Sequence, residues 1–90
     1  MADYAIWKFP IELRGLQYVE MPVGAKILYV AQQYDQVCLW AKINTNALKE
    51  RRTIHVAGTG HSIPDCGMNY IGSVMMDGGA MVFHVFEVAT

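Results

Sequence analysis

Alternation of apolar and polar residues is the main pattern of this chain. Period-two alternation is typical of β-strands, because successive side chains of a strand point to opposite faces of the sheet. Groups of Gly, Pro, Asn and Asp residues separate the alternating runs, as turns do. The pattern predicts strands in seven stretches: Tyr4–Phe9, a short strand within Arg14–Glu20, Lys26–Tyr34, Val37–Ile43, Arg51–Ala57, Tyr70–Met76 and Ala80–Val88.

The segments between these stretches predict how the strands are joined. Met21–Gly24 and Asp77–Gly79 contain the proline and glycine residues of tight turns. Tyr34–Gln36 is short enough for a hairpin turn, and the polar segment Asn44–Glu50 could hold one helical turn. About seven short strands joined in this way predict an all-β fold. We expect a single domain over residues 1–90, folded as a compact antiparallel β-sandwich or small barrel.

Strict alternation also assigns side chains to the two faces of each strand. The apolar residues of the fourth stretch share one face: Val37, Leu39, Ala41 and Ile43. Those of the third stretch divide between two faces, with Ile27, Tyr29 and Ala31 on one and Leu28 and Val30 on the other. The last stretch is apolar on both faces, which predicts a central or doubly covered strand. Within it, we expect His84 to be a core or interface histidine with both ring nitrogens satisfied.

The chain has more apolar residues than one small core needs. It is 90 residues long and 53% hydrophobic, and a chain of this length buries only about 60–65% of the surface that its unfolded form exposes. A dense core with some apolar surface would account for the excess. We expect instead a homo-oligomer, in which a partner subunit covers one face of some strands.

Charge and cysteine content narrow the function further. The net charge of −1, from seven basic and eight acidic residues, argues against a DNA or RNA polymer as partner, but not against a small anionic ligand held by a few cations. The sequence contains no apolar run of about 18 residues, so we expect no membrane-spanning helix. Its first ten residues, MADYAIWKFP, do not resemble a signal peptide. Cys38 and Cys66 have no metal-type spacing. We expect both thiols to be reduced in a cytoplasm and Cys38 to be buried.

Several short motifs follow one another in a fixed order: IWKFPI, EMPVGAKIL, CLWAKI, the R-x-I-x-V-x-G-T-G-H-x-I-P of Arg52–Pro64, YIGSV and GGAMVFHVFE. Together they cover Ile6–Glu87 and resemble a family of small domains that bacteriophages and prophages encode, classed as a domain of unknown function. The resemblance implies an all-β phage protein in the cytoplasm of the infected bacterial host. Small phage proteins include virion accessories and inhibitors of host defence, some of which are oligomeric and hold nucleotide signals.

One stretch, Arg51–Asp65, combines basic residues, two histidines and a glycine-rich turn. The turn comprises Gly58, Thr59, Gly60, His61 and Ser62. Successive amides of such a turn can form a concave nest that binds an anion. The hydroxyl groups of Thr59 and Ser62 and the ring of His61 could add donors. The same residues would equally serve a plain connection, with the glycines meeting the needs of the turn.

A nucleotide pocket would also need side chains from outside this turn. Arg52 or Lys8 would supply a cation for the phosphate. Trp7, Trp40 or Tyr70 would provide an aromatic surface on which the base could stack. Both tryptophans would also suit a plain core position.

Catalytic and metal-binding alternatives depend on the histidines. Ser62, His61 and Asp65 have the residue types of a hydrolase triad, but neighbours along a chain seldom reach triad geometry. A zinc site built from His55, His61, His84 and a cysteine lacks the usual tight ligand spacing. We therefore expect no catalytic residue, no metal ligand and no cofactor.

These observations lead to one main functional expectation and two alternatives. The main one is a phage-encoded, non-catalytic anti-defence protein. As a homo-oligomer, it would sequester a small phosphorylated nucleotide signal of host immunity, of the cyclic nucleotide or cyclic ADP-ribose type. The first alternative is a protein–protein interaction module, such as a host-takeover or virion accessory protein, without a small-molecule ligand. The second is a hydrolase that acts on such nucleotides through His61.

Overall fold

The computed structural model describes residues 3–89 and confirms the all-β prediction. Its elements, in chain order, are β1 (Tyr4–Pro10), β2 (Leu16–Pro22), β3 (Lys26–Gln33), β4 (Gln36–Asn44), β5 (Lys49–Gly58), β6 (Met68–Met76), the short 3-10 turn η1 (Asp77–Gly79) and β7 (Met81–Val88). Each predicted strand is present, with ends that differ by a few residues. Among the described residues, no helix is long and apolar enough to span a membrane.

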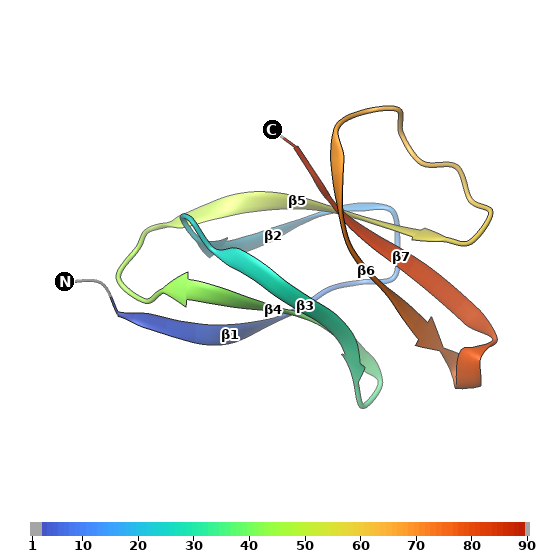
Figure 1. The fold of residues 1–90 in the computed structure, drawn as a ribbon, viewed down its shortest axis with the longest axis horizontal. Helices are drawn as coiled ribbons and strands as arrows, with labels where there is room; N and C mark the ends of the chain where they lie inside the picture. The colour runs from blue at the N-terminus through green and yellow to red at the C-terminus, as the bar shows by residue number, and fades with distance from the viewer. Residues whose placement is uncertain (1–2, 90) are drawn as a thin grey trace.

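The strands form two antiparallel sheets that do not close into a barrel (Figure 1). The three-stranded sheet has the order β1-β4-β3, and the four-stranded sheet has the order β2-β5-β7-β6. Strand β7 lies between β5 and β6, in agreement with its apolar composition on both faces. The molecule measures 45 × 31 × 15 Å along its principal axes, so it is flat and presents broad sheet faces.

The core lies between the two sheets. One face of β4 supplies its centre, because Val37, Leu39, Ala41 and Ile43 are all at most 1% exposed, as their alternation predicts. The opposite sheet contributes seven further residues: Val19 and Met21 from β2, Ile54 and Val56 from β5, Val74 from β6, and Phe83 and Val85 from β7. Burying a side chain of this size contributes about 1.5–3 kcal/mol, so this layer accounts for much of the stability of the fold.

A bulge in β3 breaks the predicted alternation of that strand. The register pairs Ile27 with Ala41 and Val30 with Leu39, and it shifts between Ile27 and Tyr29. Residues that pair across strands point to the same side, so Ile27 and Val30 both face the core. The prediction that they lie on opposite faces is therefore wrong, because Leu28 is an extra residue in the ladder.

A second bulge, in β6, brings the two sheets into close contact. The register shifts between Tyr70 and Gly72. A Cβ atom on Gly72 would lie only 2.8 Å from Val30 Cγ1 of β3, and β3 and β6 run close together in Figure 1. Glycine at this position is therefore a packing requirement, because any side chain would push β3 away.

The segment between β4 and β5 contains no helix, so the expectation of a helical turn there is wrong. Asn44 instead forms a turn in which its side-chain oxygen accepts the amide of Asn46 at 3.0 Å. Its carbonyl oxygen accepts the amide of Ala47 at 3.1 Å. Asparagine favours such local hydrogen bonds over a continuing helix.

Candidate functional site

The glycine-rich turn after β5 is tightly hydrogen-bonded to its own backbone. The amide of His61 donates to the carbonyl oxygen of Gly58 at 3.0 Å, and the amide of Thr59 donates to Val82 at 3.2 Å. Gly60 has φ of 87°, a value that the third position of a type II turn requires. The amides of Thr59 and His61 therefore already have backbone acceptors, and two of the donors expected for an anion nest are engaged within the fold.

The ring of His61 folds back over Gly58. A Cβ atom on Gly58 would lie 3.0 Å from both Cε1 and Nδ1 of that imidazole. The turn and the beginning of β7 line a hollow of about 380 Å³, in which the lining residues are Gly58, Thr59, His61, Ala80, Met81, Val82 and Phe83. This volume suits a small molecule, but the lining contains no lysine or arginine that could bind a phosphate.

Beside this hollow, His84 forms the centre of a hydrogen-bonded chain. Its Nε2 lies 2.8 Å from Thr59 Oγ1, and its Nδ1 lies 3.0 Å from Ser73 Oγ, which in turn bonds to the Tyr70 hydroxyl. A neutral imidazole has one donor and one acceptor, so one hydroxyl donates to His84 and the other accepts from it. Both ring nitrogens are satisfied, as predicted. The role of Ser73 was missed, because its position opposite His84 follows only from the β6–β7 register.

The other histidine of β5, His55, has a different environment. It faces the outside of the four-stranded sheet, opposite Leu16 on one side and Phe86 on the other. Its Nδ1 is buried without a hydrogen-bond partner among the described residues. His55 therefore does not belong to the His84 chain. No group of three His, Cys, Asp or Glu side chains in residues 3–89 could hold a metal ion.

Arg52 is committed to the fold. Its Nε and Nη2 both bond to the Glu87 carboxylate, the latter at 3.0 Å, and its Nη1 donates to the carbonyl oxygen of Ala25 at 2.8 Å. The hydrogen bond with Glu87 raises the pKa of Arg52, although partial burial opposes this effect. Arg52 points inward, away from the face that carries His55. Its guanidinium is already bonded within the fold, so Arg52 is not part of the binding surface that we describe below.

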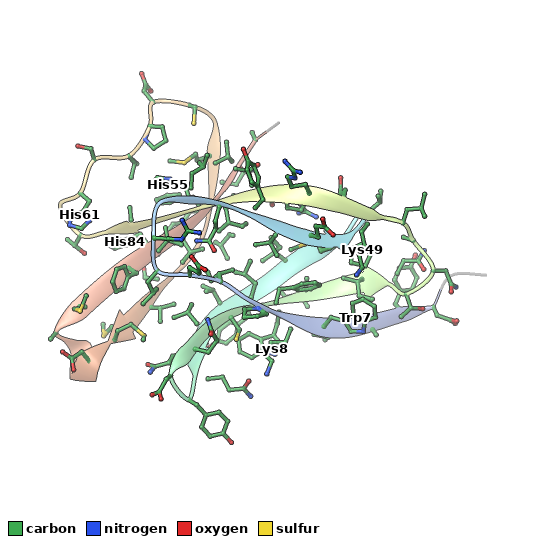
Figure 2. The ribbon with its side chains drawn as sticks, turned by 180° about the vertical axis from the view of Figure 1, so that it is seen from behind. Trp7, Lys8, Lys49, His55, His61 and His84 are labelled. Carbon is green, nitrogen blue, oxygen red and sulfur yellow. The ribbon has the colours of Figure 1, made fainter. Side chains whose placement is uncertain are left out.

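The remaining predicted residues lie on the three-stranded sheet, and the two tryptophans are on opposite faces of it. Trp7 pairs with Ala41, which belongs to the core face, whereas Lys8 pairs with Trp40 on the outer face. Figure 2 shows Trp7 and Lys8 on β1, well away from His61 and His84. The predicted site residues are therefore not one cluster. Lys8 and Trp40 combine a cation with an aromatic ring at directly paired positions. Arg52 and Tyr70 also line one hollow, of about 370 Å³, but the Arg52 guanidinium is bonded to Glu87.

Lys8 and Trp40 belong to a larger surface, the lysine–aromatic face. It comprises Lys8, Lys26, Lys42, Tyr4, Tyr29 and Trp40 on the outer side of β1, β4 and β3. The rings of Tyr29 and Trp40 lie 6.0 Å apart, and Lys42 Nζ lies 4.9 Å from the centroid of Tyr4. Lys8 Nζ donates to Gln33 Oε1 at 2.7 Å.

The charge of this face is not balanced within its sheet. Strands β1, β3 and β4 contain three lysines and no Asp or Glu. The four-stranded sheet instead has three basic residues, Lys49, Arg51 and Arg52, and three acidic ones, Glu20, Glu50 and Glu87. Lys26 and Lys42 are direct cross-strand partners, and like charges in such positions are destabilising.

Four members of the face were not among the predicted site residues: Tyr4, Lys26, Tyr29 and Lys42. Each is ordinary in the sequence, and the strand order brings them together. One feature of the sequence could have indicated this face: the predicted strands Tyr4–Phe9, Lys26–Tyr34 and Val37–Ile43 contain no acidic residue.

Comparison with known proteins gives a family but no activity. No curated protein and no solved structure matches this chain. The family described as "Domain of unknown function (DUF7352)" matches residues 3–90. Because this match covers almost the entire sequence, the chain belongs to that family of domains.

Proposed function

We propose that this protein binds a small phosphorylated nucleotide on the lysine–aromatic face and does not turn it over. The observation that carries the proposal is the direct pairing of Lys26 with Lys42 on a sheet that has no acidic residue. A pair of facing lysines costs stability in the free protein. A bound phosphate would remove this repulsion and gain a charged hydrogen bond with each lysine.

The aromatic residues beside the lysines make a nucleotide a better ligand than an inorganic anion. Trp40 and Tyr29 form a tilted aromatic pair, and Lys8 lies directly opposite Trp40. Stacking of a base on an aromatic ring contributes about 1–3 kcal/mol to the binding free energy, and it does so for any of the bases. A nucleotide lying along β4 would place its base on Trp40 and Tyr29. Its phosphate would then lie near Lys26 and Lys42, the pair two residues further along β4 on the same face.

The biological form of this proposal rests on the resemblance to phage-encoded domains. In that setting, the ligand would be a nucleotide signal of host immunity, of the cyclic nucleotide or cyclic ADP-ribose type. Binding without turnover would remove the signal from the host cytoplasm. The protein would then be an anti-defence protein. The amount of signal that it removes would depend on its own concentration and on its affinity for the nucleotide.

Calorimetric titration tests this proposal, with a panel of cyclic mononucleotides, cyclic dinucleotides, cyclic ADP-ribose isomers, inorganic phosphate and a short single-stranded oligonucleotide. We expect micromolar or tighter binding of at least one small nucleotide. Lys42→Gln should weaken that binding about 10-fold or more, since a charged hydrogen bond contributes about 1.5–3 kcal/mol. Lys49→Gln is the matched control, because Lys49 is an exposed lysine of the four-stranded sheet (Figure 2). No binding of any small nucleotide, or equal losses in both variants, would refute the proposal.

A protein–protein interaction module is the second candidate function. The observation in its favour is that Leu16 and Tyr18 are more than half exposed on the outer face of the four-stranded sheet. A pulldown from infected cells separates the two functions. A stoichiometric protein partner without nucleotide binding supports the interaction module, whereas a bound nucleotide supports the first proposal. Recovery of the nucleotide unchanged after long incubation excludes the hydrolase.

A further inference from the structure

The outer side of the four-stranded sheet carries a row of one leucine, one histidine and two aromatic residues that the nucleotide proposal does not use. One residue from each strand contributes to it, because Leu16 pairs with His55, His55 with Phe86, and Phe86 with Tyr70. We call this surface, together with Tyr18 and Met75, the neutral face. The ring of Tyr70 contacts Phe86 edge-on at 5.5 Å between centroids, which joins the β6 and β7 members of the row.

The neutral face is more exposed than a monomer of this size needs. Leu16 is 51%, Tyr18 60%, Tyr70 59% and Met75 66% exposed. Contiguous apolar surface of this kind marks an interaction site in soluble proteins. Single exposed apolar residues would carry no such meaning, but here Leu16 and Tyr18 are neighbours on one face of β2, and Tyr70 of β6 packs against Phe86 of β7.

The charge distribution decides which partner suits this face. On the outer side of its sheet, Glu20 and Arg51 are cross-strand partners of opposite charge, and Lys49 lies at one end of β5. The other charged residues of these strands, Arg52, Glu50 and Glu87, lie on the inner side. On the outer side, Arg51 lies over the ring of Tyr18 at 4.8 Å, near one end of the sheet. A second copy of this face therefore meets the uncompensated charge of Lys49 alone, near one end of the sheet. The lysine–aromatic face, with three uncompensated lysines, would repel its own copy.

The size of the sheet also fits a symmetric dimer. Four strands about 4.8 Å apart and about eight residues long span roughly 19 × 26 Å in the backbone plane. The protruding leucine, tyrosine, phenylalanine and methionine side chains add to this area. A standard interface buries about 800 Å² on each partner, which such a surface can approach. In a two-fold dimer the same patch is used twice, so self-complementarity is the only requirement.

We propose that two copies of this chain form a two-fold symmetric dimer through the neutral face. This arrangement leaves the lysine–aromatic face of each copy open on the outside of the dimer. It also explains why β7 is apolar on both sides, since its inner residues pack in the core and its outer residues face the partner. The dimer does not depend on the nucleotide ligand.

Sedimentation analysis of the purified protein tests the dimer. We expect about twice the chain mass of 10.1 kDa at tens of micromolar. Leu16→Lys and Met75→Lys should each convert the protein to monomer, because each would bury a lysine charge without a partner in the apolar interface. Ile6→Lys is the matched control, since Ile6 is 62% exposed but lies on the three-stranded sheet. It should leave the dimer intact.

Three results would overturn this inference: a wild-type protein that is monomeric at 100 μM, dissociation by Ile6→Lys but not by Leu16→Lys or Met75→Lys, or a dimer that resists both lysine variants. Circular dichroism of each variant confirms that a monomer is folded. Nucleotide titration of the Leu16→Lys protein separates the two proposals. If the monomeric variant still binds the nucleotide, the nucleotide proposal is supported independently of the dimer.

Discussion

Gly72 and Gly58 both lie against a neighbouring side chain, but the two neighbours differ in their freedom to move. The neighbour of Gly72 is the buried Val30, whose branched side chain is fixed between the sheets. The neighbour of Gly58 is the exposed ring of His61 at the end of a turn. The same chemical change should therefore have different costs at the two positions.

Gly72→Ala should lower the free energy of unfolding by about 1–3 kcal/mol, the usual cost of forcing an extra methyl group into a packed core. Gly58→Ala should cost clearly less, because the His61 ring can rotate into solvent. Urea unfolding of both variants measures the difference. Equal costs at the two positions, or a negligible cost for Gly72→Ala, would contradict the account of how β3 meets β6.

Lys26 illustrates a residue whose contribution to stability and to binding should have opposite signs. It faces Lys42 across the ladder. We expect Lys26→Gln to stabilise the free protein by up to about 1 kcal/mol, because it removes a like-charge pair. The gain should shrink in high salt, which screens exposed charges. Thermal unfolding at low and high salt measures the effect, and a loss of stability at low salt would show that the two lysines do not repel each other.

At the scale of elements, Arg52 joins three parts of the chain. It lies on β5, bonds to Glu87 on β7, and donates to Ala25 in the turn before β3. Arg52→Gln should lower the free energy of unfolding by about 1.5–3 kcal/mol, the typical value of a charged hydrogen bond. It should leave nucleotide affinity unchanged under conditions in which the variant is folded. A variant that keeps its stability but loses binding would instead make Arg52 a ligand residue.

The pH dependence of this contribution follows from the direction of the pKa shift. The pKa of Arg52 is raised in the folded protein, so its stabilising effect is complete below the unfolded pKa and is lost only at strongly alkaline pH. The difference in unfolding free energy between wild type and Arg52→Gln should therefore gain no pH dependence from Arg52 itself over about pH 6–9. Denaturant unfolding at several pH values measures this difference.

The predicted strands are more accurate than the predicted site, for a physical reason. Strand positions follow from local alternation, so the buried face of β4 could be predicted from Val37 to Ile43 alone. The bulge at Leu28 could not, because it depends on which β4 residues pair with β3. The lysine–aromatic face could not be predicted for the same reason. Lys42 and Tyr4 come together only through the β1–β4 register, which no local pattern contains.

At the scale of the whole molecule, charge and apolar surface are separated between the two sheets. The three-stranded sheet presents lysines and aromatic rings, and the four-stranded sheet presents apolar residues on an outer face where Glu20 pairs with Arg51 and Lys49 lies at one end. A flat two-sheet domain can therefore bind an anion on one side and its own copy on the other. The Gly58–Ser62 turn, which the sequence pattern favoured, lies at the end of β5, in the other sheet from the lysine–aromatic face.

The two tryptophans give the most direct test of where the ligand binds, because they lie on opposite faces of the same sheet. In a Trp7→Phe protein, Trp40 is the single tryptophan, and in a Trp40→Phe protein, Trp7 is. Titration with the tightest nucleotide of the panel, followed by tryptophan fluorescence, reports the contact. We predict strong quenching in the Trp7→Phe protein and little change in the Trp40→Phe protein. Quenching of Trp7 alone, or nucleotide binding that leaves Trp40 emission unchanged, would contradict a binding site on the lysine–aromatic face.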